Sequence, residues 1–330
     1  MLEAIVAARE SVYLEMYRFD TDTEGFNFTD ELAKSARNGV KVIVILDVLG
    51  SWTLSKEGIE RLKKSGVEVL FYSFFLRRTH RKILIVDGKT AFVGGVNIRG
   101  KYTFWKDLQV KVTGKVVESI VRSFARVYHE CGGRDVALTS ILPRSVLAKT
   151  KFWFLERGIG KREHLLRKYY EDRIKNAEKS IVFVTPYLLP PRWLIAHLHQ
   201  AILRGVIVEI LLPYATDHRL ANRANWSFAA FLSRLGARCY FMKGMNHAKA
   251  ILIDSREGMV GSGNLDFLSF NWNIEAGIFF SEPAMVRDLA KIVHGWKSKA
   301  TLFDQSKAKF HWYDIPMAFL LRLFGFLPLW

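Results

Sequence analysis

Residues 80–97 read HRKILIVDGKTAFVGGVN, and residues 247–264 read HAKAILIDSREGMVGSGN. Both stretches begin with His-x-Lys, reach an Asp after four further residues and end at an Asn, with a constant offset of 167 positions between the copies. One such pattern carries little weight, but two copies in register indicate a duplicated unit. Two histidines and two lysines supplied by matched halves suit chemistry on a phosphate diester.

Each copy begins as a strand of branched apolar residues. Because side chains alternate along a strand, His80 and Lys82 share one face, and so do His247 and Lys249. We expect these four side chains to form the catalytic set, with the two copies facing each other across a seam between the halves.

A turn then returns each strand as a hairpin. Asp87 and Gly88 predict a tight turn in the first copy, and residues 254–258 predict a longer turn in the second. We therefore assign Asp87 and Asp254 structural roles, as turn formers or salt-bridge partners.

Small residues follow each hairpin, Gly-Gly at 94–95 and Gly-Ser-Gly at 261–263. They allow backbone amides and the following asparagines to approach a bound anion. We expect Asn97, Asn264 and Ser262 to bind the substrate phosphate.

A nucleophilic imidazole needs a partner on its other nitrogen to fix the tautomer. Asp107 and Glu275 lie at matched positions, 27 and 28 residues after the histidines of their own halves. We predict that these carboxylates orient the imidazoles. The alternative interpretation is an ordinary surface carboxylate at each position.

Together these groups suggest a mechanism. One imidazole attacks phosphorus, while the other protonates the departing alcohol and later takes the proton of the incoming one. Two lysines and two asparagines compensate the charge of the five-coordinate transition state, so we expect no metal and no other cofactor. The symmetry of the sequence does not decide which histidine is the nucleophile.

Strand and helix patterns alternate in both halves, which predicts an α/β fold. We expect two similar α/β/α sandwich halves, residues 1–150 and 151–330, packed as a pseudo-twofold bilobal unit with the active site at the seam. No clear periodicity is visible around residues 149–162, near the join. Strands are expected at 12–17, 40–46, 67–72, 181–184, 206–212 and 238–241, and helices at 29–37, 56–64, 193–203 and 228–235.

The amino-acid composition limits the classes of partner that the protein is expected to bind. Half of the 330 residues are hydrophobic, which excludes a disordered chain, and the net charge of +17 favours nucleic acid, an anionic membrane or phosphorylated substrates. The 24 Phe and 9 Trp favour lipid among these. Only two cysteines occur, Cys131 and Cys239, so a disulfide framework and a Cys-x-x-Cys metal site are excluded.

The ends of the chain bear on membrane attachment. We expect no signal peptide, because residues 1–4 run directly into a helical pattern, and no apolar run reaches bilayer-spanning length. Residues 315–330 form an apolar stretch that suits either an interfacial membrane contact or docking on the core. The abrupt start is also compatible with a membrane-anchoring leader that this sequence does not include.

Two further groups are candidate substrate contacts. Phe71, Phe74 and residues 75–76 precede Arg-Arg-Thr at 77–79, a combination that suits acyl chains and phosphates at a site mouth or, alternatively, a core strand with a basic turn. His218 follows a predicted buried strand, where ligands often bind in α/β sheets.

The chain resembles the phospholipase D superfamily and, within it, the bacterial cardiolipin synthases. Residues 80–97 are similar to the first family motif, residues 105–107 (Trp-Lys-Asp) to its W-x-D continuation, and residues 247–275 to the second motif with its downstream acid. Residues 185–187 and 212–217 resemble the substrate loops of the second half.

The resemblance implies a phosphatidyltransferase that makes cardiolipin from two phosphatidylglycerol molecules and releases glycerol. It assigns nucleophilic attack to His80 and acid–base work to His247. It also implies anionic phospholipid as partner, no nucleic acid, and a peripheral place on the bacterial cytoplasmic membrane. Two departures from the family pattern are expected: this sequence does not include the hydrophobic N-terminal leader of the family, and Pro190-Pro191 replaces a more polar stretch.

Three alternatives stay open. Water or another alcohol attacks the same intermediate in a phospholipase D-type hydrolase or another headgroup transferase. A phosphodiesterase acting on nucleic acid shares the catalytic set but uses spaced stacking aromatics along a basic groove. A catalytically inactive scaffold that binds anionic lipid is the third.

Overall fold

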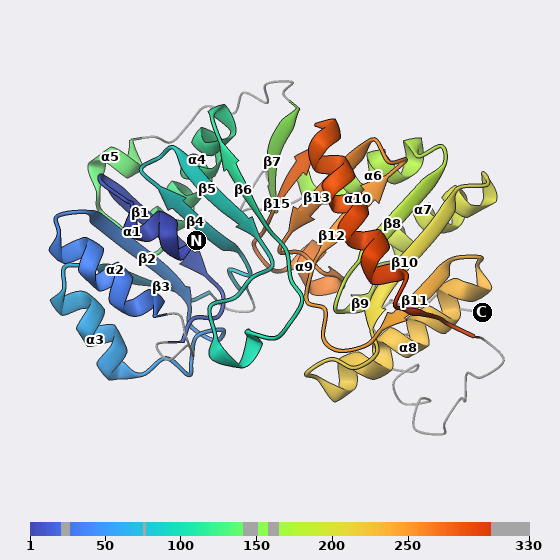
Figure 1. Cartoon of the computed structure of the whole chain (residues 1–330), viewed down its shortest axis with the longest axis horizontal. Helices are drawn as coiled ribbons and strands as arrows, with labels where there is room; N and C mark the ends of the chain where they lie inside the picture. The colour runs from blue at the N-terminus through green and yellow to red at the C-terminus, as the bar shows by residue number, and fades with distance from the viewer. Residues whose placement is uncertain (21–26, 75–76, 141–150, 158–164, 305–330) are drawn as a thin grey trace.

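The computed structural model describes residues 1–330 except 21–26, 75–76, 141–150, 158–164 and 305–330. The described residues form two large sheets, one in each half, with helices packed around them (Figure 1). The apolar stretch 315–330 lies outside the described residues, so its membrane contact stays a prediction.

The first sheet has the strand order β3-β2-β1-β4-β5-β6 among the described residues. Strands β1, β2 and β3 are parallel, whereas β4, β5 and β6 follow as an antiparallel meander. The strands are β1 (Ser11–Met16), β2 (Lys41–Asp47), β3 (Glu68–Tyr72), β4 (Lys82–Val86), β5 (Thr90–Gly94) and β6 (Gln109–Thr113). The helices are α1 (Leu2–Val6), α2 (Phe28–Arg37), α3 (Lys56–Lys64), η1 (Gly100–Tyr102), α4 (Lys115–Glu130) and α5 (Val136–Thr139).

The second sheet repeats this order as β11-β10-β8-β12-β13-β15, with β16 added at one edge and β7 at the other. Its strands are β7 (Phe152–Arg157), β8 (Ser180–Val184), β10 (Ile207–Pro213), β11 (Arg238–Met242), β12 (Ala250–Ile253), β13 (Glu257–Gly261), β15 (Glu275–Phe280) and β16 (Thr301–Leu302), while β9 (Leu188–Leu189) and β14 (Leu265–Asp266) pair separately. The helices are α6 (Leu165–Asn176), α7 (Arg192–Leu203), α8 (Arg219–Arg234), α9 (Phe267–Asn271) and α10 (Pro283–Lys297). The predicted α/β fold with two similar halves is confirmed.

Apolar side chains bind these layers together in three clusters. Leu32 of α2 packs on the outer side of the first sheet, and Leu198 of α7 on the outer side of the second. The third cluster contains residues of both halves, including Phe124 of α4 and Ile278 of β15. Since burying apolar area is the main stabilising term, this shared core fixes the two halves against each other.

Two glycines end matched helices before the buried central strands. Gly39 follows α2 with φ 86°, and Gly205 follows α7 with φ 88°. A residue with a Cβ is strained at such angles, so the glycine sets where each helix ends. This is why the sequence located both helix ends correctly.

Each motif strand ends in a three-residue turn, before β5 and β13 respectively. Asp87 adopts φ 52° and Asp254 φ 53°, so both occupy the left-handed region that short polar side chains tolerate. The longer turn expected at 254–258 is wrong, because β13 already begins at Glu257.

The two turn aspartates bind backbone amides at the starts of β1 and β8. The Asp87 carboxylate accepts N–H bonds of 2.8–3.2 Å from residues 9–11, and Asp254 accepts bonds of 2.7–3.0 Å from residues 178–180. Partial burial raises the pKa of both carboxyls, but these hydrogen bonds outweigh it and leave each pKa below its usual value. The geometry supports a structural role for both.

Two elements differ from the sequence-based expectation. Strand β7 lies where no periodicity was visible, because its polar residues Glu156 and Arg157 are both buried and hide the alternation. Helix α8 begins at Arg219 rather than at residue 228, since its first two turns are mainly polar.

Candidate active site

Two matched backbone bridges hold the motifs together at the seam. Thr79 pairs in parallel with Ile274, and Asn246 pairs in the same way with Lys106. The His80 N–H donates to the Ile274 carbonyl at 3.0 Å, and the His247 N–H donates to the Lys106 carbonyl at 2.7 Å. Each histidine is therefore attached to the segment that precedes the acid of the other half.

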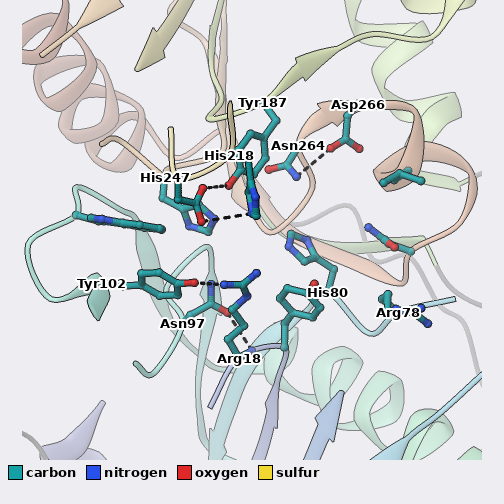
Figure 2. Close-up of a pocket in the computed structure, with 15 residues that line it drawn as sticks. Arg18, Arg78, His80, Asn97, Tyr102, Tyr187, His218, His247, Asn264 and Asp266 are labelled. Carbon is teal, nitrogen blue, oxygen red and sulfur yellow. Dashed lines mark hydrogen bonds and ion pairs between the residues drawn. The ribbon is translucent and has the colours of Figure 1, made fainter. Parts of the chain in front are cut away.

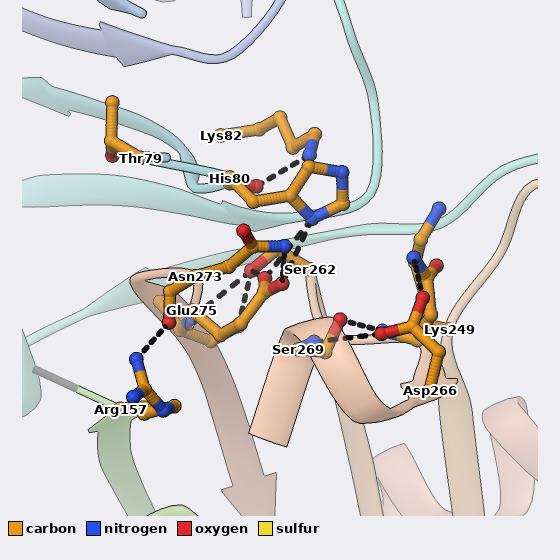
Figure 3. Close-up of polar contacts among 12 residues, drawn as sticks. Thr79, His80, Lys82, Arg157, Lys249, Ser262, Asp266, Ser269, Asn273 and Glu275 are labelled. Atoms are coloured by element: carbon orange, nitrogen blue, oxygen red, sulfur yellow. Dashed lines mark hydrogen bonds and ion pairs between the residues drawn. The ribbon is translucent and has the colours of Figure 1, made fainter. Parts of the chain in front are cut away.

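This arrangement crosses the acids between the halves. Nδ1 of His80 lies 3.0 and 3.2 Å from the carboxylate oxygens of Glu275 (Figure 3), and Nδ1 of His247 lies 2.7 Å from Oδ2 of Asp107. The spacing of 27 and 28 residues suggests pairs within one half, whereas the contacts join opposite halves. Each carboxylate accepts the Nδ1 proton and leaves Nε2 for chemistry.

The two acids have different supports. The Ser262 hydroxyl donates to Glu275 at 2.5 Å, so this side chain holds the acid and is absent from the cavity lining, contrary to the expected phosphate contact. At the matched position in the first half, Gly95 lets the Asp107 carboxylate lie directly against the backbone. Arg157 of β7 donates to the Asn273 carbonyl at 2.6 Å and fixes the segment before Glu275.

Burial sets the protonation of the histidines. It lowers the pKa of both imidazoles to about 4, with Lys82 adding to the effect at His80 and Lys249 at His247, although the paired carboxylates oppose it. The pKa of Glu275 falls to about 2, because the His80 partnership outweighs burial. Near neutral pH the site therefore holds neutral imidazoles against ionised carboxylates.

The motif lysines lie behind the histidines. Lys82 and Lys249 are fully buried, each donates to the carbonyl of the histidine two residues before it, and neither lines the cavity. Burial lowers the pKa of Lys82 well below its usual value, with the Lys249 charge adding to the effect, and burial lowers the pKa of Lys249 to about 8. Both lysines thus lie behind the wall of the cavity and not in its lining.

Both histidines open into one cavity of about 330 Å³ at the seam (Figure 2). The predicted asparagines line it as well. The Oδ1 atom of Asn97 accepts the Arg18 N–H at 3.2 Å, while Nδ2 of Asn264 donates to Asp266 at 3.1 Å. Oδ1 of Asn264 is buried without a hydrogen-bond partner among the described residues.

Sequence reasoning missed several cavity residues. Tyr17 packs edge-on against the His80 ring at 4.6 Å, and Trp105 lies 5.5 Å from the His247 ring. Arg18 also lines the cavity. The available signal was position, because residues 17–18 leave the end of β1 as residues 185–187 leave the end of β8.

The second half supplies a polar wall. His218 lines the cavity, in agreement with its place among the candidate contacts, and Asp217 lines it beside His218. The Tyr187 hydroxyl donates to Asp217 at 2.6 Å. In Figure 2 Tyr187 and His218 face the side of the cavity that carries Arg18 and Arg78.

The described part of the chain lacks two features. No group of three or more His, Cys, Asp or Glu side chains there is arranged to hold a metal ion. Among the same residues, no helix combines the length and apolar character needed to cross a bilayer.

A family model described as "Cardiolipin synthase, PLD-like domain" matches residues 1–127 and 170–296. The chain belongs to this family. The two matched segments coincide with the two halves seen in the fold, and each contains one His-x-Lys motif.

Similar curated proteins carry the same description. The chain is 31% identical to a probable cardiolipin synthase, YwiE, of Bacillus subtilis and 31% identical to a cardiolipin synthase of Alkalihalophilus pseudofirmus. Each alignment covers 88% of this chain and 61% of the relative, so the chain spans about three-fifths of the length of these proteins.

Solved structures share the fold. A phosphatidylserine synthase of Haemophilus influenzae superposes with a TM-score of 0.74 at 16% identity, over 98% of this chain and 89% of that one. A polyphosphate kinase of Porphyromonas gingivalis gives a TM-score of 0.64 at 14% identity, over 98% of this chain and 50% of that one. At these identities the likeness concerns the fold alone.

Proposed function

We propose that this cardiolipin synthase family member transfers a phosphatidyl group from one phosphatidylglycerol to another, making cardiolipin and releasing glycerol. The observation that carries the proposal is the pair of histidines in one cavity, each with Nδ1 on a carboxylate of the other half. Family membership and the cardiolipin synthase relatives support the choice of lipid substrate.

In the first step, Nε2 of His80 attacks phosphorus and forms an N–P bond, while the P–O bond to the glycerol headgroup breaks. Glu275 holds the Nδ1 proton of His80 and stabilises the positive charge that develops on the ring. His247 donates its Nε2 proton to the departing alkoxide, so it must enter the step protonated. The anionic phosphodiester favours this state, because it raises the pKa of an imidazole beside it.

In the second step, the now neutral His247 takes the proton of an incoming hydroxyl, whose oxygen attacks the phosphohistidine. The N–P bond breaks, cardiolipin leaves, and the starting protonation states return. Lys82 and Lys249 act through the cavity wall on the charge of the transition state, and Asn97 and Asn264 position the phosphate.

We further propose that the protein works at the periphery of a membrane that supplies phosphatidylglycerol, the bacterial cytoplasmic membrane. The basic net charge supports an anionic surface as partner.

The test is incubation of purified protein with phosphatidylglycerol vesicles, followed by mass spectrometry of the lipids and assay of glycerol. Cardiolipin and glycerol are expected in equal amounts from wild type, and neither from His80→Ala or His247→Ala. His199→Ala on α7, outside the cavity lining, is the matched control and retains turnover. Phosphatidate in place of cardiolipin identifies a hydrolase and overturns the proposal, as does cleavage of DNA without any lipid reaction.

A covalent adduct tests the assignment of the nucleophile. After brief reaction with labelled donor and quenching in base, which preserves phosphohistidine, the label is expected on the peptide that contains His80. Label on the peptide that contains His247 would reverse the two roles.

A further inference from the structure

The active-site cavity lies where the carboxyl ends of the parallel strands of both sheets meet. We call this end of the sheets the cavity edge. Strands β1, β2, β3, β8, β10 and β11 end at this edge, and the strands that follow His80 and His247 begin there. The loops that leave this edge therefore surround the cavity. In Figure 1 the loop that carries η1 and the helix α8 both lie along the lower side of the molecule, where this edge faces.

Exposed aromatic side chains gather on these loops. Among the described residues, the aromatic side chains that count as large exposed hydrophobics are Trp52 (78% exposed), Phe74 (45%), Phe104 (90%), Tyr214 (60%) and Trp272 (37%). We call this set the aromatic rim. All five follow or precede a strand at the cavity edge.

The rest of the described surface differs. Exposed large hydrophobic residues away from this edge are all aliphatic, namely Val6, Val136, Leu165, Leu203, Ile207, Ile292 and Leu302. Aromatic rings are expensive to expose and are favoured where an apolar layer meets water, so their confinement to one edge indicates a contact surface.

The rim is continuous with the cavity. The Phe74 carbonyl accepts a bond from Arg78, which lines the cavity, and Phe104 lies next to the lining residue Trp105 in the chain. Ser51, before Trp52, donates its hydroxyl to the Tyr17 carbonyl at 3.0 Å. Whatever the rim contacts is therefore presented directly to the two histidines.

The exposed charges near the aromatic rim indicate what the rim contacts. Lys101 and Lys106 are exposed on either side of Phe104, Arg219 is exposed at the start of α8, and Lys243 is exposed after β11. Exposed aromatics interspersed with cations match the headgroup layer of an anionic bilayer, where rings enter the interface and ammonium groups meet phosphates. A nucleic acid instead uses rings spaced along a groove, whereas Trp52 and Phe104 project from loop tips.

We infer that the aromatic rim is the membrane-docking surface, which seats the cavity mouth on an anionic phospholipid bilayer. The inference rests on the proposed function and deepens it, since it explains how headgroups reach two buried histidines without leaving the bilayer.

The test compares two double variants by co-sedimentation with phosphatidylglycerol vesicles. Trp52→Ser/Phe104→Ser alters the rim, and Val136→Ser/Leu203→Ser alters two other exposed apolar residues away from it. The rim variant is expected to lose vesicle binding by about 10-fold or more, because two rings no longer enter the interface. The control variant is expected to bind as wild type. Equal binding by the two variants overturns the inference, and so does a rim variant that loses binding to single-stranded DNA but not to vesicles.

Turnover separates this inference from the proposed function. With a short-chain phosphatidylglycerol dispersed below its micelle concentration, the rim variant is expected to match wild type, and with vesicles it is expected to be slower. If wild type fails to turn over the dispersed and vesicular lipid alike, the proposed function fails, whereas the binding comparison still decides the role of the rim.

Discussion

In the first half the residue between the motif histidine and lysine is Arg81, whereas in the second half it is Ala248. Arg81 is fully buried on the face opposite the site, and it donates to Glu15 at 2.9 Å and to Glu156 of β7 at 3.1 Å. Ala248 instead lies in the apolar core shared by the halves. The two halves thus present the same chemical groups on different supports, ionic in one and apolar in the other.

The duplicated halves share some features of the site and differ in others. The histidines, their turn aspartates and the backbone bridges at the seam match between the halves. The residues that hold the acids do not match, since Ser262 corresponds to Gly95. The symmetry therefore lies in the reacting groups and the backbone, and the packing behind them differs.

The largest expected effect tests whether the crossed acids are equivalent. Asp107→Asn and Glu275→Gln should each lower kcat by about 10³-fold or more, because an amide no longer fixes the imidazole tautomer or stabilises its charge. Steady-state kinetics on phosphatidylglycerol vesicles provides the measurement. A variant that retains the full rate removes that acid from the proposed mechanism.

The next effect concerns the ionic support. Arg81→Ala should lower the free energy of unfolding by about 3–5 kcal/mol, since it leaves Glu15 buried without its partner. The double variant Glu15→Val/Arg81→Ala replaces the ion pair with apolar side chains, as in the second half, and should recover part of the lost free energy of unfolding. Urea denaturation measures both variants. If the double variant is less stable than the single one, the two supports are not interchangeable.

A smaller effect should distinguish the supports of the acids. A Cβ at Gly95 would lie 2.2 Å from Oδ1 of Asp107, so Gly95→Ala should displace this acid and slow turnover by about 10- to 100-fold. Ser262→Ala removes one hydrogen bond to Glu275 and should cost about 10-fold or less. The ratio of the two rates is the readout. A larger loss of rate for Ser262→Ala would show that Glu275 depends more on its support than Asp107 does.

The smallest effect should be equal in the two halves. Asp87→Asn and Asp254→Asn keep the turn but weaken three backbone hydrogen bonds, so each should cost about 1 kcal/mol of stability. Turnover at a temperature well below unfolding should not change. A strong loss of rate in a folded variant would move that aspartate from structure to chemistry.

The sequence predicted the motif strands and the helix ends because these depend on local chemistry. Runs of branched apolar residues predicted β4 and β12, although His80 and His247 lie just before these strands, and glycine marked the ends of α2 and α7. The seam was predicted because each motif supplies half of the catalytic set.

The remaining features depend on contacts between distant segments. The spacing of Asp107 and Glu275 suggests pairs within one half, whereas the bridge between Thr79 and Ile274 brings Glu275 to the histidine of the other half. Ser262 likewise takes its place from a contact that the sequence does not reveal, because its hydroxyl bonds to the Glu275 carboxylate. Strand β7 could not be recognised, because burying Arg157 requires carbonyl partners at residues 270–273 that only the fold supplies.

The crossed pairs have a consequence for when chemistry can begin. Neither half alone contains a complete histidine–carboxylate pair. A half-synthesised or partly opened chain therefore carries a histidine without the carboxylate that contacts its Nδ1 atom. Both pairs are complete only when the two halves pack against each other, and the backbone bridges at the seam form in the same step. If the proposed mechanism holds, catalytic activity should therefore appear only after the two halves have docked.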